Sequence, residues 1–196
     1  MTWWMTSLQF VWDAFKLWIH NLFLGPFSNV DIFWILAPVY ISLIITEIFQ
    51  EKKGTSLGNA TSNSVIALWG GVDFMRITLK SWTSFALSGA KLGIAVFILA
   101  YGVFILVLGL KASDLLRHVA RIRVVSYIII IFAPLYYTPV QMSVLYLFGA
   151  IAFFPLFYLV LYLIDKITPD PVSLKKDMGG NDAFPSTNNP FGNQKF

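Results

Sequence analysis

The chain has 196 residues, of which 57% are hydrophobic and only 12% are charged, and its net charge is +4. An ordinary soluble domain carries roughly 25% charged residues, so this composition excludes a water-soluble globular fold and predicts an all-α, polytopic integral membrane protein. The chain has no cysteine, which excludes disulfides, iron–sulfur ligation and thiol catalysis. Its bases flank apolar segments, a pattern that requires no nucleic-acid partner.

The first predicted element is an amphipathic helix over residues 2–24. Its polar residues form a narrow stripe that includes Asp13, Lys16 and His20, and the other positions are mostly Trp, Phe, Leu, Ile and Met. A surface helix normally has a broader polar face, so the narrow stripe favours a spanning helix that turns this side toward other helices or a wet cavity. The tryptophans spread along the helix favour an interfacial position instead.

The next segment, 31–50, is a nearly uninterrupted apolar run with the length needed to cross a ~30 Å hydrocarbon core. It contains Pro38, which frees a backbone carbonyl, and Glu47 near its end. Carboxylates and freed carbonyls form many cation sites, so Glu47 is a candidate for a polar interior or a transport route. Alternatively, its carboxylate reaches the interface and has no such role.

A second amphipathic helix is predicted over residues 65–86, where Asp73, Arg76 and Lys80 repeat the spacing of the first polar stripe. Each amphipathic segment precedes a long apolar span, here 92–110, which suggests a duplicated helix pair. Pairing an Asp with a base three residues later reduces the cost of placing both in lipid. These residues are therefore either candidates for a polar interior or transport route, or intrahelical ion pairs that make the helices tolerable in a membrane.

A basic stretch follows the span 92–110, and in it Asp114, Arg117 and Arg121 show the same acid–base–base spacing. We expect a short helix resting on anionic head groups, where each base contributes ~1 kcal/mol. The residues expected to contact lipid head groups are Lys111, Arg117, His118, Arg121 and Arg123.

The last two apolar segments are 124–138, which is short for a span, and 140–164. Tyr136 and Tyr137 end the shorter segment as an aromatic anchor, followed by a proline, and predict a tight turn between antiparallel helices. Helices are expected throughout because lipid offers no partner for backbone polar groups. The predicted fold is a bundle of four to six transmembrane helices over residues 1–164.

The distribution of lysine and arginine between the loops favours six spans over four. With six spans, nearly all loop bases fall on the side that the positive-inside rule assigns to the cytoplasm. With four spans, the loop that follows residue 50 lies outside, so its bases count for the non-cytoplasmic side and the difference between the two sides becomes smaller. Both arrangements place the N- and C-termini in the cytoplasm, and we expect the cell membrane as the location.

Residues 165–196 have a different composition, with many Pro, Gly and Asn and few large aliphatic side chains. Such a segment cannot offset the entropy cost of ordering, so we expect a disordered cytoplasmic tail. Its aromatic islands are either docking points for a cytoplasmic partner or parts of a solvated terminus. The candidate docking residues are Phe184, Asn189, Pro190, Phe191 and Phe196.

The sequence has no glycine-rich phosphate loop, no cluster of metal ligands and no nucleophile with a base at a recognisable spacing. We therefore expect no enzymatic activity, no metal and no cofactor. The predicted function is a structural or assembly subunit of a membrane complex, whose partners are the lipid bilayer and another membrane protein or further copies of this chain. The alternative is a small oligomeric channel or transporter with an interior lined by Asp13, Asp73 and Arg76.

Overall fold

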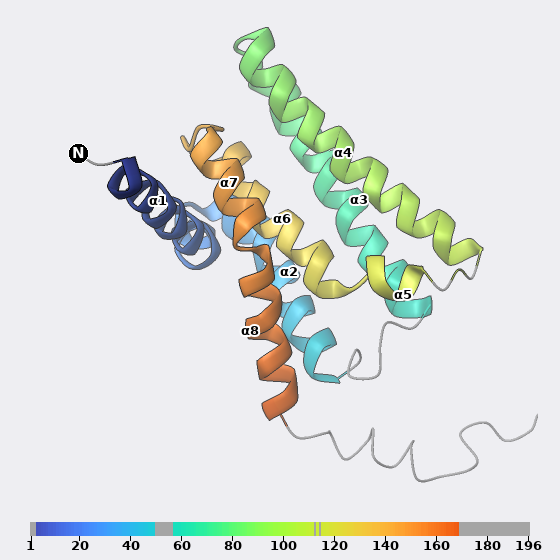
Figure 1. Cartoon of the computed structure of the whole chain (residues 1–196). Helices are drawn as coiled ribbons and strands as arrows, with labels where there is room; N and C mark the ends of the chain where they lie inside the picture. Colours follow the sequence, from blue (N-terminus) through green and yellow to red (C-terminus); the bar gives the residue numbers. More distant parts are fainter. Residues whose placement is uncertain (1–2, 50–56, 112, 114, 169–196) are drawn as a thin grey trace, which may run out of the picture.

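The computed structural model describes residues 3–49, 57–111, 113 and 115–168, and every regular element in these ranges is helical (Figure 1). The predicted all-α class is confirmed for this part of the chain. In order, the elements are α1 (Trp3–Phe23), the 3-10 turn η1 (Gly25–Phe27), α2 (Val30–Phe49), α3 (Leu57–Lys80), α4 (Phe85–Leu110), α5 (Leu116–Val119), α6 (Ile122–Tyr137), α7 (Val144–Ala152) and α8 (Phe154–Ile167).

Three stretches of the described residues are long and apolar enough to cross a membrane. They are Val30–Glu47 in α2, Phe85–Leu110 in α4, and Val144–Ile167, which comprises α7 and α8. Helix α6 is apolar but shorter. By length and composition these three stretches are candidate membrane spans of an all-helical chain.

Helix α6 lies at the centre of the bundle, between α2 and α3, and twelve of its sixteen residues are buried. Tyrosines attach it to its neighbours through backbone carbonyls. The hydroxyl of Tyr127 accepts a hydrogen bond from Trp18 Nε1 of α1 at 2.9 Å and donates to the carbonyl of Ala150 in α7 at 2.6 Å. Because lipid cannot satisfy these polar groups, the contacts fix how α1 and α7 sit on α6.

The start of α2 is fixed to the end of α6 by Asn29. Its side-chain oxygen accepts the backbone N–H of Ile32 at 2.9 Å, as an N-cap residue does, and its amide donates to the carbonyl of Tyr137 at 2.7 Å. These two bonds bring the first turn of α2 beside the last turn of α6, where the candidate site is found.

Helices α3 and α4 form a long antiparallel hairpin (Figure 1). Helix α3 begins earlier than the predicted segment 65–86 and ends at Lys80, because Ser84 is the N-cap of α4 and accepts the N–H of Leu87 at 3.3 Å. Glycines allow close approach of the two helices. A Cβ added at Gly102 would lie 2.9 Å from the backbone nitrogen of Leu68, and one at Gly71 would lie 2.8 Å from that of Leu99.

Helix α1 packs mainly against α7 and meets α2 near its own C-terminal end, where the Tyr40 hydroxyl donates to the Leu22 carbonyl. Because α3 packs along α4 instead, the suggested duplication of a helix pair is not reflected in the packing. A Cβ on Gly149 of α7 would lie 3.0 Å from the carbonyl oxygen of Ala14. The last apolar segment is divided at Phe153, and Pro155 stands in the first turn of α8. Proline is tolerated there because the first N–H groups of a helix have no intrahelical acceptor.

The third acid–base–base set does not lie on one helix, contrary to the sequence prediction. Helix α5 ends at Val119, and Arg121 is the extended residue that precedes α6. Asp114 lies outside the described residues, as does the side chain of Arg117. The break at Ala120 is stabilised by Asn63 of α3, whose amide donates to the Ala120 carbonyl at 2.7 Å.

The close packing of α3 on α4 gives a first testable prediction. Gly102→Ala should lower the free energy of unfolding by about 1–3 kcal/mol, because the added methyl group meets backbone and forces the helices apart. Gly93→Ala is the matched control, since nothing lies within 4 Å of a Cβ at that position of the same helix. Thermal unfolding of the two variants in detergent, followed by circular dichroism, checks the difference, and equal stabilities would contradict it.

Candidate functional site

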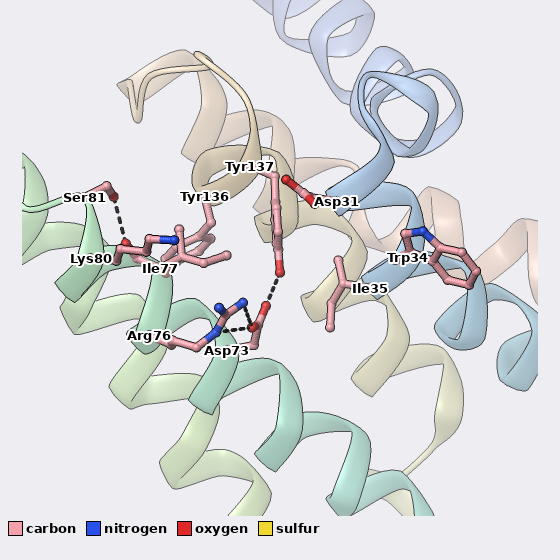
Figure 2. Close-up of a pocket in the computed structure, with 10 residues that line it drawn as sticks. All are labelled: Asp31, Trp34, Ile35, Asp73, Arg76, Ile77, Lys80, Ser81, Tyr136 and Tyr137. Atoms are coloured by element: carbon pink, nitrogen blue, oxygen red, sulfur yellow. Dashed lines mark hydrogen bonds and ion pairs between the residues drawn. The ribbon is translucent and has the colours of Figure 1, made fainter.

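A polar pocket of about 690 Å³ lies where the first turn of α2, the last turns of α3 and the end of α6 meet. Its charged lining residues are Asp31 from α2 and Asp73, Arg76 and Lys80 from α3. Figure 2 shows these side chains converging around Tyr137, the last residue of α6. The pocket therefore combines two carboxylates and two bases at one end of the bundle.

Asp73 is the centre of the hydrogen bonding in this pocket. Its Oδ1 accepts two bonds from Arg76, from Nε at 2.9 Å and from Nη2 at 2.6 Å, while its Oδ2 accepts a bond from the Tyr137 hydroxyl. The Asp73 side chain is only 11% exposed, whereas that of Arg76 is 64% exposed. Asp73 is thus neutralised within α3 and tied to α6, and the guanidinium of Arg76 faces the pocket (Figure 2).

Lys80 and Asp31 are the two charged residues of the pocket that do not take part in this hydrogen bonding around Asp73. Both residues are exposed, and neither forms an ion pair within the described part of the chain. Lys80 extends over Ile77 toward Tyr136 (Figure 2). Asp31 lies in the first turn of α2, where the positive end of the helix dipole stabilises a carboxylate.

The opposite end of the bundle contains a second ionic cluster, which is buried. Arg123, at the start of α6, donates from Nε to both carboxylate oxygens of Glu47 at 2.8 Å and from Nη2 to Oε1. Arg123 Nη2 also lies 3.3 Å from Asp165 Oδ2 in α8. The side chains of Arg123 and Glu47 are 5% and 3% exposed, so the cluster joins the ends of α2, α6 and α8 away from solvent.

Tyr158 completes the contact between α6 and α8. Its ring centroid lies 5.1 Å from the guanidinium carbon of Arg123, within cation–π range, and its hydroxyl accepts a 2.6 Å hydrogen bond from Arg121 Nη1. In the described structure Arg123 Nη1 and Asp165 Oδ1 are buried without a hydrogen-bond partner. Each of these two unpaired polar atoms carries a desolvation cost that the rest of the cluster must offset.

The structure brings together only part of the predicted polar interior. Asp73, Arg76 and Lys80 share the pocket. Asp13 and Lys16 form an exposed ion pair of 2.7 Å within α1, and their stripe, with His20, faces away from the packed side of α1. The expectation that this stripe turns toward other helices is wrong for the single chain, since α1 buries the side formed by Ala14, Trp18, Asn21 and Leu22.

Among the expected head-group contacts, Arg123 is the clear exception. It was grouped with Lys111, His118 and Arg121 as a surface base, yet it is buried because Glu47 and Asp165 neutralise it. Lys111 and His118 are exposed. Glu47, a transport candidate, is the partner of Arg123 and does not line the polar pocket.

Several residues of the two clusters were not predicted. Asp165 was assigned to the tail, but α8 continues to Ile167 and presents Asp165 to Arg123. Asp31 and Tyr137 were interpreted only as the ends of apolar spans. An acid and a tyrosine at helix ends on the same side of a bundle indicate that these ends can form one polar site, and this signal was present in the sequence. The candidate docking residues Phe184, Asn189, Pro190, Phe191 and Phe196 lie outside the described residues.

Comparisons with protein-family models, with curated proteins and with solved structures gave no match to this chain. Within the described residues no group of three or more His, Cys, Asp or Glu side chains is arranged to hold a metal ion.

The buried cluster gives a second prediction. Arg123→Met should lower the free energy of unfolding by about 3–5 kcal/mol, because it leaves the Glu47 carboxylate buried without a counter-charge. Adding Glu47→Gln to this variant should recover part of the loss, since the uncompensated charge is then removed. The control is Lys166→Met, which removes an exposed base from the same end. Denaturant unfolding in detergent measures all three, and an Arg123→Met variant as stable as the control would contradict the assignment.

Proposed function

We propose that this protein is a non-catalytic subunit of a membrane complex, in which a rigid helical bundle presents a surface of α8 to another membrane protein. The observation that carries the proposal is the separation of its charges into two layers. The Asp73 and Arg123 clusters sit at opposite ends of α6, and the fourteen-residue separation of Arg123 and Tyr137 corresponds to ~21 Å along a helix. Between these layers α2, α3 and α6 carry no charged residue.

This charge distribution supports a scaffold and argues against an ion route through one chain. An ion that leaves the Asp73 pocket would meet Trp34, Ile35 and the apolar side chains beyond them, where no charged group replaces its hydration shell. The buried ion pair at the other end joins three helices to one another. Asp73, at the other end, is hydrogen-bonded to Arg76 and to Tyr137 of α6, so these paired charges hold the bundle together, whereas Asp31 and Lys80 stay exposed in the pocket.

Helix α8 is the proposed contact surface. None of its fourteen residues is buried, although Phe154, Phe157 and Leu161 touch the core. A hollow of about 520 Å³ on this helix is lined by aromatic and aliphatic side chains, among them Pro155, Tyr158 and Tyr162. A second transmembrane helix that packs into this hollow would bury the exposed face of α8.

We further propose six spans with both termini in the cytoplasm, at the cell membrane. Helix α3 is less apolar than the three candidate spans, but it packs along α4 as an antiparallel hairpin partner. If α4 crosses the bilayer, α3 crosses with it, since its charged residues are paired or lie in its last turns. The ends of α2, α4 and α8 and the start of α6 then face the cytoplasm with most of the loop bases.

Cysteine labelling tests this topology, because the chain has no native cysteine. Thr83→Cys, in the turn between α3 and α4, should react with a membrane-impermeant maleimide on intact cells. Thr55→Cys, between α2 and α3 in the sequence, should react only after permeabilisation. Labelling of both variants on intact cells would show that α3 does not cross the membrane.

Site-specific photocrosslinking tests the assembly proposal. A photoreactive amino acid at Leu159 of α8 should give a discrete protein adduct in native membranes, and the same residue at Phe97 on the exposed face of α4 should give none. Both positions are at least half exposed in the bundle, so they differ in location and not in accessibility. An adduct of twice the chain mass would identify a second copy, and protein adducts absent from both positions would contradict the proposal.

The alternative function is the channel or transporter with Asp73 and Arg76 in its route, formed between several chains. A flux assay on the purified protein distinguishes the transporter from the assembly subunit. Liposomes containing the wild type should show no flux of protons or potassium above that of empty liposomes if the protein is a scaffold. A flux that Asp73→Asn reduces, with the protein still folded, would favour the transporter over the assembly subunit.

A further inference from the structure

The polar pocket continues into an apolar hollow of about 370 Å³ that lies between α2 and α3. Trp34 and Ile35 line both spaces, so the two are parts of one groove. Helix α6 contributes Tyr136 and Tyr137 at the polar part and Ile129 at the apolar part. We call this continuous feature the α2–α3 groove.

One face of each helix lines the groove along its length. On α2 the lining residues follow the helical repeat from Asp31 through Pro38 to Ser42, and on α3 they run from Val65 through Trp69 to Lys80. The regular spacing shows that the groove follows the helices and is not a local gap between two side chains. From Val65 to Lys80 it extends over sixteen residues, which is a rise of ~22 Å along a helix.

The groove changes from charged to apolar along this length. Its four charged residues, Asp31, Asp73, Arg76 and Lys80, are all in the polar part, at the ends of α2 and α3. The apolar part is lined by aliphatic and tryptophan side chains, with Ser42 and Gly70. A bilayer with its head groups is about 40–45 Å thick, so one leaflet measures about half of that. The groove therefore matches one lipid molecule in length and in polarity.

The charges in the polar part select the kind of head group. Two acids and two bases give the pocket a formal charge of zero, and Asp73 is already bonded to Arg76 and Tyr137. The remaining exposed groups are the Lys80 ammonium and the Arg76 guanidinium on α3, and the Asp31 carboxylate on α2. A ligand that carries both a phosphate and an ammonium group can pair its phosphate with the two bases on α3 and its ammonium with the carboxylate on α2.

We propose that the α2–α3 groove binds one zwitterionic phospholipid of the ethanolamine type. The phosphate lies against Arg76 and Lys80, the primary ammonium group donates hydrogen bonds to Asp31, and an acyl chain follows Trp34, Pro38 and Trp69 along the apolar part. A primary ammonium fits better than a choline, because quaternary nitrogen has no hydrogen to donate to the carboxylate. Arginine and lysine are the usual partners of phosphate.

A neighbouring transmembrane helix fits the groove less well. Helix contacts in membranes favour small residues that let backbones approach, but Trp34 and Trp69 stand on the two sides of this groove and are 70% and 68% exposed. A helix in this position would also place its backbone beside four charged side chains. A flexible acyl chain requires neither close backbone approach nor a polar match in the apolar part.

The experiment uses the full chain purified in detergent and freed of lipid, so it does not depend on the proposed partner of α8. The probes are short-chain phosphatidylethanolamine, phosphatidylcholine and phosphatidylglycerol with identical acyl groups, titrated while the thermal midpoint is recorded. A ligand that binds the folded state raises the midpoint in a saturable way. We expect phosphatidylethanolamine to bind at least about tenfold more tightly than phosphatidylglycerol, which corresponds to one decade in Kd, with phosphatidylcholine between them.

Variants separate the groove from the general lipid surface. Asp31→Asn and Lys80→Gln should each weaken phosphatidylethanolamine binding about tenfold, and both positions are exposed, so folding is preserved. Lys91→Gln removes a base at the same end from outside the groove and should leave binding unchanged. In the apolar part, Ser42→Phe should block binding, and Ile41→Phe, on the adjacent exposed position, should not.

The outcomes decide the proposal. Equal stabilisation by the ethanolamine and glycerol lipids would overturn the zwitterionic head group. Stabilisation that none of the groove variants changes would overturn the site, because the lipids would then be acting as general solvent for the apolar surface. A preference for phosphatidylethanolamine that Asp31→Asn abolishes and Lys91→Gln preserves establishes the assignment.

Discussion

The buried ion pair between Arg123 and Glu47 determines how the helices of this bundle meet. Each charge alone would cost several kcal/mol in an environment of low dielectric constant, so α2 and α6 can approach only in the register that joins them. Asp165 then brings the end of α8 to the same point. The position of α8, a helix with no buried residue, thus depends on this polar contact together with the packing of Phe154 and Phe157 on Tyr127 of α6.

The same constraint explains the rest of the charge distribution. Asp73 is near the end of α3, and two partners, Arg76 and Tyr137, neutralise and orient it. Between the two ionic layers the helices are joined by packing and by tyrosine hydroxyls that donate to backbone carbonyls, such as Tyr146 to Ile131. Polar groups between these layers are therefore satisfied one by one, and α2, α3 and α6 keep their charges at the two boundaries.

Local features of this structure could be predicted from the sequence, and distant ones could not. Hydrophobic runs and the i, i+3 pairs Asp13–Lys16 and Asp73–Arg76 depend on residues within one helix, so periodicity was sufficient to find them. The partner of Glu47 is 76 residues away, and Arg123 lies in a basic stretch where a surface role was the natural expectation. The second amphipathic helix is predicted to continue to residue 86, but Ser84 caps the N-terminus of α4 and α3 ends at Lys80. The proposed phospholipid groove is formed by residues of α2 and α3 with α6 beneath them, so no single segment of the sequence contains all of its lining residues.

The distance in sequence between Glu47 and Arg123 has a consequence for biosynthesis. A nascent chain that has delivered α1 to α4 to the membrane holds Glu47 at the end of α2 with its counter-charge still in the ribosome. Until α6 arrives, that carboxylate stays hydrated at the interface, and the N-terminal helices have no fixed neighbour there. Completion of the bundle is therefore a late event in translation, and a chain arrested before residue 123 would display an unpaired acid that quality-control proteases could recognise.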